Sequence, residues 1–284
     1  MTFKEALSYA REILTTQDIE DAPLESELLL RHALQISRVE LYLDPKRKLT
    51  PEQEETFLSL IKRRLSLEPT AYITNNREFY GLDFYVDSRV LIPRAESELL
   101  VDEALMLAQN YSLATIADIG TGCGAIAISL ALNLPQAKIY ATDISTPALE
   151  VARLNCQRYG VSRRIELLQG NLLEVLPQPV DLVVANLPYV KKSELRQMSD
   201  KNSEPLLALD GGSDGLEKTR ELVSQLKDKL SPKGFLLLET GFNQARAATS
   251  FFKSRFPQAS IEVIPDFGGI DRVVRFSLTP KPGK

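Results

Sequence analysis

The sequence has 284 residues, of which 44% are hydrophobic and 25% are charged, so it has the composition of a folded globular protein with room for one large and one small domain. Its longest nearly apolar run, residues 125–134, is much shorter than the roughly 18 residues that indicate a membrane span. The net charge of −4 and the isoelectric point near 5.4 argue against a surface that binds nucleic acid through its phosphates.

The counts of individual residue types narrow the function further. The chain has two cysteines, Cys123 and Cys156, and one histidine, His32. Two cysteines cannot form a disulfide framework, and a single histidine in an amphipathic segment favours a packing or surface role over a metal site or a catalytic triad. We therefore expect no metal. The N-terminal segment lacks the apolar core of a signal peptide, so we expect a cytoplasmic protein without a membrane partner.

The first 75 residues have helical periodicity. Apolar residues recur three and four positions apart in segments 3–14, 22–34 and 51–67. Asp21 and Thr50 resemble helix N-caps, each followed by a proline at the start of the helix. The pattern predicts a small helical domain over residues 1–75.

From residue 76 onward the periodicity changes twice. Residues 76–94 place aromatic and β-branched residues around Gly81, which predicts a β-hairpin linker. From residue 95 to 284, short apolar strands alternate with helical stretches, which is typical of a parallel sheet covered by helices on both faces. The expected strands are 115–120, 138–143, 164–169, 181–186 and 234–240, with a terminal hairpin of 261–265 and 272–278 at the sheet edge. The tail 279–284 is expected to be disordered.

Residues that end the first three strands indicate a nucleoside site. Ligands of open α/β sheets bind at the carboxyl ends of the strands. The first strand runs into "DIGTGCG", residues 118–124, whose glycines permit a tight turn and close backbone approach. Asp143 ends the second strand, where it can accept hydrogen bonds from ribose hydroxyls, although it could instead cap the helix near Thr146. Asn171, after the third strand, could bond an adenine edge.

These features alone leave two cofactors open, NAD and S-adenosylmethionine. The glycine pattern, with Ala127 in its last position, is closer to that of methyltransferases than to a dinucleotide fingerprint.

The fourth strand ends in "NLPY", residues 186–189, and this tetrapeptide favours the methyl donor. A planar amide nitrogen is a poor nucleophile, and an enzyme can assist it by accepting both N–H groups and aligning the nitrogen with the methyl group. Asn186 offers its side-chain oxygen, and the carbonyl of Leu187, held extended before Pro188, offers a second acceptor. Tyr189 offers a flat face. The tetrapeptide is suited to hold a planar NH2 group.

Together these motifs resemble the HemK/PrmC family, the glutamine methyltransferases that modify class I peptide chain release factors. The matching segments follow the family's order and spacing: 71–100, 118–131, 186–190, 204–216 and 236–244. The resemblance covers almost the whole chain. It implies an α/β fold, a Rossmann-like class I S-adenosylmethionine-dependent methyltransferase domain over 95–284, with the helical domain 1–75 and the hairpin 76–94 before it.

The resemblance also implies roles for individual residues. The S-adenosylmethionine site, which would release S-adenosylhomocysteine, would comprise Gly120, Thr121, Gly122, Cys123, Gly124, Asp143, Asn171 and Asn186. Asn186, Leu187, Pro188 and Tyr189 would hold the glutamine of a Gly-Gly-Gln motif, with Asn186, Pro188 and Tyr189 catalytic. Release factors would be the protein partners of a monomeric enzyme. Leu187 replaces the first proline of the usual Asn-Pro-Pro-Tyr, and because its backbone carbonyl is the acceptor, we expect the geometry to survive.

Two other functions remain open from the sequence. Asn-Leu-Pro-Tyr also occurs in adenine-N6 methyltransferases that act on ribosomal RNA, although those enzymes carry an accessory domain after the catalytic one, whereas the helical domain comes first in this chain. A non-catalytic nucleotide-binding module is the third possibility, and it leaves the amide-holding tetrapeptide unexplained.

Overall fold

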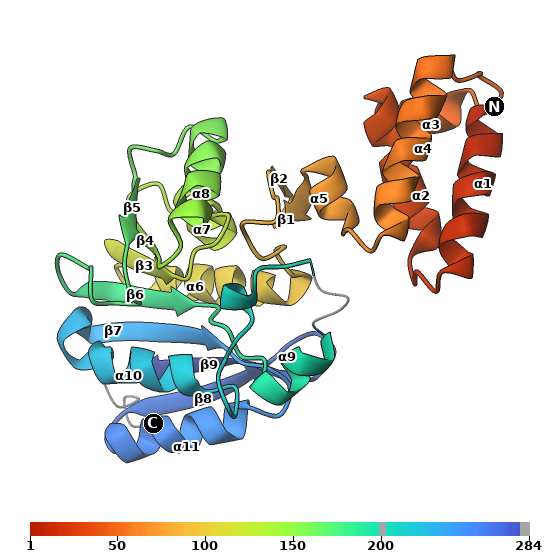
Figure 1. Cartoon of the computed structure of the whole chain (residues 1–284). Coiled ribbons are helices and arrows are strands. Elements are labelled where there is room, and N and C mark those ends of the chain that lie inside the picture. The colour runs from red at the N-terminus through yellow and green to blue at the C-terminus, as the bar shows by residue number, and fades with distance from the viewer. Residues whose placement is uncertain (199–202, 279–284) are drawn as a thin grey trace. The chain divides into compact units, whose positions relative to one another are not determined.

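The computed structural model describes residues 1–198 and 203–278 (Figure 1). The tail expected to be disordered, 279–284, lies outside the described residues. The chain divides after Asn76 into two compact units. The division falls within two residues of the predicted end of the helical domain, and each unit has its own core.

The first unit is helical. Its elements are α1 (Phe3–Thr16), α2 (Ala22–Leu34), α3 (Arg38–Leu43), α4 (Pro51–Leu65) and α5 (Thr70–Thr74). Thr50 caps α4 in a reciprocal capping box with Gln53, as expected for a threonine before a proline. Asp21 occupies the N-cap position of α2, but its side chain makes no capping hydrogen bond. The apolar faces of the helices enclose a core that includes Phe3, Leu14, Leu29, Leu30, Phe57 and Ile73.

A short hairpin opens the second unit. Strands β1 (Arg77–Phe79) and β2 (Leu82–Phe84) are antiparallel, and Tyr80 and Gly81 between them have φ of 52° and 69°. Two central residues with positive φ match the right-handed twist of the strands, which confirms the predicted hairpin around Gly81. The hairpin packs within the larger unit. Asn155 of α8 (Thr146–Arg158) accepts from the backbone N–H of Tyr85 at 2.9 Å and donates to the Tyr85 carbonyl at 3.0 Å.

A sheet with strand order β5-β4-β3-β6-β7-β9-β8 forms the centre of the larger unit. Its strands are β3 (Thr115–Ile119), β4 (Lys138–Asp143), β5 (Ile165–Gln169), β6 (Val180–Ala185), β7 (Leu230–Glu239), β8 (Ser260–Pro265) and β9 (Asp271–Ser277). The first five are parallel, and β9 is antiparallel to β7 and to β8, which lies at the edge. The parallel sheet and the terminal hairpin are thus confirmed. Strand β7 begins earlier than predicted because Leu230 pairs with Val180 across a register shift.

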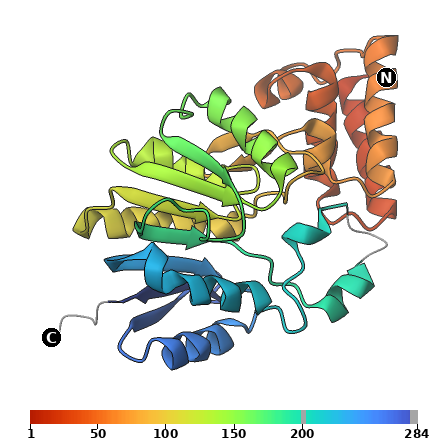
Figure 2. The same cartoon turned by 60° about the vertical axis from the view of Figure 1, so that its left-hand side comes forward.

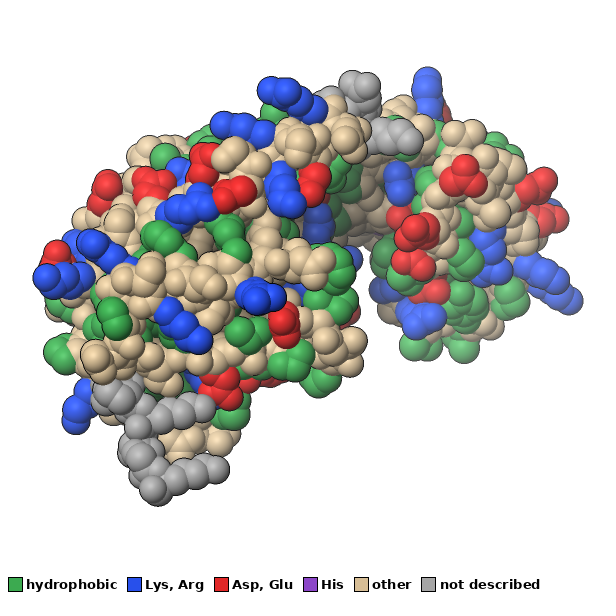
Figure 3. Space-filling model, turned by 90° about the horizontal axis from the view of Figure 1, so that it is seen from below, with side chains coloured by type: hydrophobic (Ala, Val, Ile, Leu, Met, Phe, Trp, Pro, Cys, Tyr) green, Lys and Arg blue, Asp and Glu red, His purple; other side chains and the backbone are tan. Residues whose placement is uncertain are grey.

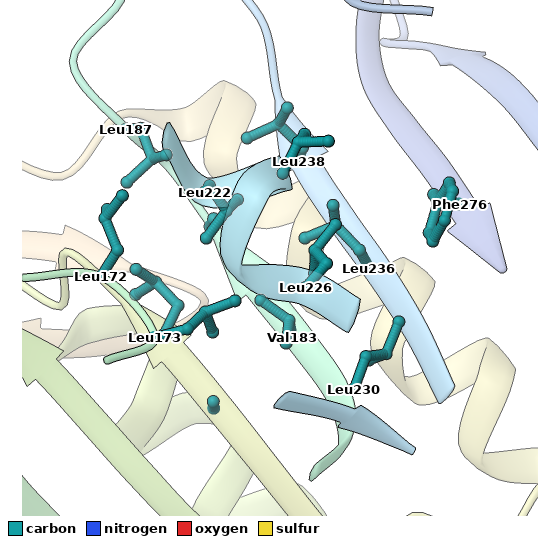
Figure 4. Packing of buried hydrophobic residues seen from close by; sticks show 14 of the residues in the cluster. Leu172, Leu173, Val183, Leu187, Leu222, Leu226, Leu230, Leu236, Leu238 and Phe276 are labelled. Atoms are coloured by element: carbon teal, nitrogen blue, oxygen red, sulfur yellow. The ribbon is translucent and has the colours of Figure 1, made fainter. Parts of the chain in front are cut away.

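Helices cover both faces of this sheet (Figure 2). The helices of the larger unit are α6 (Glu98–Asn110), α7 (Ala125–Asn133), α8, α9 (Lys192–Met198), α10 (Glu217–Lys229) and α11 (Ala245–Arg255), and its 3₁₀ turns are η1 (Ala95–Ser97) and η2 (Leu206–Ala208). Figure 4 shows Leu222 and Leu226 of α10 in one cluster with Val183 of β6 and Leu236 of β7. Burying each such side chain contributes about 1.5–3 kcal/mol, so the packing holds the strand ends in place. In the described ranges, no helix combines the length and the apolar character needed to cross a membrane.

Candidate active site

The site lies where the order of strands reverses. Strand β3 pairs with β4 on one side and β6 on the other, and Ile119 is in register with Ala185. The next residues, Gly120 and Asn186, therefore leave the sheet side by side. A Cβ atom on Gly120 would lie 3.5 Å from the Asn186 carbonyl oxygen. Such a switch point is where open α/β sheets bind ligands.

A pocket with about 840 Å³ of empty space, including its open mouth, occupies this position. Predicted site residues that line it are Gly120, Gly122, Asp143, Asn171, Asn186, Leu187 and Pro188. Residues that the sequence analysis did not place at the site also line it, among them residues 89–91, Pro205, Leu207 and Ala208. Thr121, Cys123, Gly124 and Tyr189 are not part of this lining.

The glycine turn bends as the sequence predicts. Gly120, Gly122 and Gly124 have φ of 72°, 55° and 84°, a region that residues with a Cβ rarely enter. Thr121 and Cys123 point into the protein. The Thr121 hydroxyl donates to Asp118 at 2.6 Å, and burial raises the pKa of the Cys123 thiol to about 12, so this cysteine stays a protonated packing residue. These two residues can contribute to the pocket only through their backbone.

Asp118, the last but one residue of β3, is a buried acid that sequence reasoning left without a role. Its Oδ2 accepts from Thr121 and from the backbone N–H of Ala127, whereas its Oδ1 accepts no hydrogen bond from the described residues. Burial raises the pKa of Asp118 to about 6. Its place at the head of the glycine motif was the signal that could have identified it.

Asp143 reaches the pocket and also braces the glycine turn. Its Oδ2 accepts from the Gly122 backbone N–H at 3.0 Å, and its Oδ1 accepts from Ser145 N–H at 2.9 Å. Burial raises its pKa, while these backbone bonds oppose the shift. The N-cap of α8 is Ser145, which accepts from Ala148 N–H. The alternative role of Asp143 as that helix's cap is therefore wrong.

Asn171 lines the pocket in a fixed orientation. Its Nδ2 donates to Glu221 Oε1 at 2.5 Å, and the other oxygen of Glu221 accepts from Lys218 at 2.8 Å. One N–H of the Asn171 amide is thus engaged, and its Oδ1 could accept from an adenine amino group. The adenine contact stays a prediction.

The tetrapeptide at the end of β6 is tied to a buried acid on the neighbouring strand. Asn186 Nδ2 donates to Ser97 Oγ at 2.8 Å, and the Ser97 hydroxyl donates to Glu239 Oε2 at 2.6 Å. The Tyr189 hydroxyl contacts Glu239 Oε1 at 3.3 Å. Burial, followed by the charge of Glu239, raises the pKa of Tyr189 to about 12, so its ring is neutral at physiological pH. Leu187 is buried in the core cluster beside the sheet.

Glycines enclose the backbone of Tyr189. A Cβ on Gly211 would lie 2.6 Å from the Tyr189 Cα, and one on Gly215 would lie 2.4 Å from the Tyr189 carbonyl oxygen. That carbonyl accepts from Gln244 Nε2 at 2.8 Å, and a Cβ on Gly241 would lie 2.9 Å from the tyrosine ring. The density of glycines in 211–215 was the available signal for this contact.

In the segment "PRAESE", residues 93–98, the residue that contacts the tetrapeptide is a neutral serine and not one of the charged residues. Arg94 pairs with Glu204 at 2.5 Å, and Glu98 accepts from Tyr80 N–H at 2.9 Å. The neutral Ser97 between the acids, rather than any charged residue, contacts Asn186. Sequence reasoning missed Ser97 because a serine among acidic residues gives no chemical signal.

Comparison with known proteins first establishes the class. Residues 95–203 match the methyltransferase small domain family. The crystal structure of a ribosomal protein L11 methylase from Lactobacillus delbrueckii subsp. bulgaricus has the same fold, with a TM-score of 0.51 and 21% identity, over 68% of this chain and 84% of that one. The fold, the domain match and the pocket at the switch point define a methyltransferase, and thus an enzyme.

Full-length relatives then give the family. Residues 5–74 match the PrmC N-terminal domain. The release factor glutamine methyltransferase of Moorella thermoacetica is 40% identical over 274 residues, covering 96% of this chain and 97% of that protein. The protein of the same description from Geobacter sulfurreducens is 40% identical over 276 residues, covering 96% and 95%. The chain belongs to the family of release factor glutamine methyltransferases.

The crowding around Tyr189 predicts that Gly215→Ala damages the site. Gly215 has φ of 80°, and an added methyl group would overlap the Tyr189 carbonyl. We expect the rate of methyl transfer to fall by about tenfold or more, in addition to a loss of stability of roughly 1–2 kcal/mol from backbone strain. Gly160→Ala is the matched control, because Gly160 has φ of 66° but no atom within 4 Å of the added Cβ. Equal activity of the two variants would contradict the role of Gly215.

Proposed function

We propose that this protein transfers a methyl group from S-adenosylmethionine to the side-chain amide nitrogen of the glutamine in the Gly-Gly-Gln motif of class I peptide chain release factors. The observation that carries the proposal is the hydrogen bond from Asn186 Nδ2 to Ser97. Asn186 lines the pocket, and this bond leaves its amide oxygen available to accept a hydrogen bond there. The 40% identity to release factor glutamine methyltransferases over nearly the whole chain supports the same substrate.

The residues of the pocket fit S-adenosylmethionine. Asp143 presents a carboxylate whose two oxygens each accept one backbone N–H, and each oxygen has capacity for a further hydrogen bond from a ribose hydroxyl. Gly120 and Gly122 allow close backbone approach. The buried Asp118 Oδ1 has no hydrogen-bonding partner among the described residues, and a nearby cationic group of the cofactor would favour its ionised form.

When bound, the cofactor supplies a methyl group on a positively charged sulfur; its transfer forms a carbon–nitrogen bond, breaks the carbon–sulfur bond and releases one amide proton to water. The protein's residues must hold the amide nitrogen in line with that methyl group. Asn186 Oδ1 accepts one N–H of the glutamine, and the Leu187 carbonyl accepts the other. With both N–H groups engaged, electron density on nitrogen is favoured and its orientation is set.

Pro188 and Tyr189 complete this proposed arrangement. Pro188 disfavours helical backbone angles at Leu187, so the Leu187 carbonyl stays extended toward the substrate. Tyr189 is held at its backbone by Gln244 and at its hydroxyl by Glu239, which fixes the position of its ring. A ring fixed in this way can stack on the planar amide.

Charge distribution favours a protein substrate over RNA. On the face of the molecule seen in Figure 3, basic and acidic side chains are interspersed in each unit. Together with the net charge of −4, this pattern is unlike the concentrated basic surface of a protein that follows a phosphate backbone. A glutamine flanked by glycines, in contrast, can enter a narrow pocket without side chains in its way.

The first unit offers a surface for the folded partner. On α3, Val39 and Leu43 are 73% and 80% exposed and Tyr42 is 49% exposed, at helical spacing that places the three on one side. Exposed apolar groups of this kind mark protein contacts. We assign them to a release-factor surface distant from the glutamine loop.

Asn186→Ala is expected to reduce methyl transfer to an intact release factor by about 100-fold or more while cofactor affinity is retained, because the lost oxygen faces the substrate. Single-turnover methylation and calorimetric cofactor binding would measure the two effects. Asn133→Ala, which removes an exposed amide that bonds the Ser129 carbonyl, is the control. Turnover by Asn186→Ala at the rate of this control would remove Asn186 from the mechanism.

Asp143→Ala is expected to weaken cofactor binding by about tenfold or more, since a hydrogen bond to a charged group contributes about 1.5–3 kcal/mol. Asp181→Ala is a matched control: Asp181 also accepts backbone N–H groups, of Ala114 and Thr115, but at the amino end of β6. It should lower stability and leave the dissociation constant for S-adenosylmethionine unchanged. Similar binding by both variants would refute the ribose assignment.

A short Gly-Gly-Gln peptide is expected to have a kcat/KM at least about tenfold below that of the intact factor, because it cannot make the second contact. Val39→Ser combined with Leu43→Ser should lower kcat/KM for the intact factor and leave that for the peptide unchanged. Equal efficiency for peptide and protein would contradict the docking role of the first unit. Preferential methylation of RNA would contradict the substrate assignment itself.

A further inference from the structure

A single buried carboxylate, that of Glu239, connects both functional ends of the tetrapeptide. Glu239 ends β7 next to β6 and is 3% exposed. One of its oxygens accepts from the Tyr189 hydroxyl, and the other accepts from Ser97, which in turn accepts from Asn186. A buried charge is costly to keep, and none of these contacts serves the packing of apolar groups.

The number of protons shared by Glu239, Ser97 and Asn186 determines which group donates in each of these hydrogen bonds. An ionised Glu239 only accepts hydrogen bonds, so the one proton of the Ser97 hydroxyl is committed to it. The Ser97 oxygen can then only accept from Asn186. The side-chain atom of Asn186 that faces Ser97 must therefore be the NH2 group, because an amide oxygen there would oppose a lone pair. The amide oxygen is thus directed to the other side, where Asn186 lines the pocket.

We propose that Ser97 and Glu239 are positioning residues that set the side-chain amide of Asn186 with its oxygen toward the substrate. This inference rests on the proposed function, in which that oxygen accepts an N–H of the glutamine. Neither residue touches the substrate. In an unrestrained asparagine the two amide orientations, with oxygen and nitrogen exchanged, would have similar energies. Ser97 and Glu239 act by making the orientation with the oxygen toward Ser97 unfavourable.

Titration of Glu239 gives the arrangement a characteristic pH dependence. Burial raises the pKa of Glu239, and the hydrogen bond from Ser97 and the charge of Arg272 on β9 oppose the shift. Tyr189 and Glu96 are the other titratable groups that act on it. A protonated Glu239 can donate to Ser97, and Ser97 can then donate to an amide oxygen. As the pH falls through the raised pKa, the constraint on Asn186 is lost and methyl transfer should decline.

The first test compares serine variants with S-adenosylmethionine and an intact release factor as substrates. Ser97→Ala should lower kcat by about tenfold, the scale of a charge-assisted hydrogen bond, with cofactor binding retained. Ser97→Thr keeps the hydroxyl and should restore most of the rate. Ser129→Ala is the control, because Ser129 is buried in the same unit and its hydroxyl donates only to the Ala125 carbonyl. If Ser97 had a purely structural role, Ser97→Ala would lower stability and would affect kcat and cofactor binding together.

The second test uses the pH profile of kcat. Glu239→Gln keeps the shape of the side chain but removes this titrating group, so at saturating S-adenosylmethionine kcat should fall less steeply at low pH than in the wild type. The rate should also be reduced at all pH values. The pH profile of Glu239→Gln also tests the positioning role if Ser97→Ala does not bind the cofactor. The double variant of Ser97→Ala and Glu239→Gln should be no slower than the slower single variant, since both changes break one chain.

Each proposal fails on a different result. If Ser97→Ala matches Ser129→Ala in kcat, or if Glu239→Gln retains the wild-type decline at low pH, the positioning role is wrong while the wild-type enzyme still methylates the release factor. If the wild-type enzyme does not methylate an intact release factor, the proposed function is wrong.

Discussion

The parallel pairing of β3 with β6 is the constraint on which the site depends. It brings Gly120 and Asn186, which are 66 positions apart in the chain, to the same edge of the sheet, and a Cβ on Gly120 would lie only 3.5 Å from the carbonyl of Asn186. The glycine turn and the tetrapeptide, to which we assign the cofactor and the substrate amide, are therefore adjacent. Burial of Val183, Leu236 and their neighbours beneath α10 favours this register, because a slip by one residue would move these side chains to the opposite face of the sheet.

Functional backbone in this protein is held by close contact with other backbone. Tyr189 is surrounded by Gly211, Gly215 and Gly241, and its carbonyl accepts from Gln244. Contacts this close leave no room for side chains, so glycine is required for packing at these positions as well as for backbone angle. Asn186, Leu187 and Pro188, which line the pocket, are therefore followed by a residue whose backbone is fixed on several sides.

Buried polar groups perform a second kind of positioning. The two carboxylates Asp143 and Glu239 end β4 and β7, on either side of the β3–β6 pair. Each binds segments from elsewhere in the unit: Asp143 accepts from the glycine turn, and Glu239 accepts from Ser97 and Tyr189. Such networks are costly when incomplete and rigid when satisfied. The partners of Asp143 are backbone N–H groups, which can only donate. At Glu239 the partners are hydroxyls, so there the direction of the hydrogen bonds depends on the ionisation of the acid.

Local pattern in the sequence determined the helical first unit, the alternating strands, the turn at Gly120–Gly124 and the strand-end positions of Asp143 and Asn186, because periodicity, capping and turn chemistry act between near neighbours. It could not determine that Ser97 supports Asn186, 89 residues away, or that Gly215 abuts Tyr189. Ser97 comes from η1, before the first strand of the sheet, and Gly215 comes from the long connection between β6 and β7, so both pairs form only when the chain folds back on itself. The tertiary structure also decided that Thr121 and Cys123 point inward. Hydrogen bonds from the Thr121 hydroxyl to Asp118 and from Asn155 to the Cys123 carbonyl fix the turn, and the fixed turn determines which side chains face the pocket.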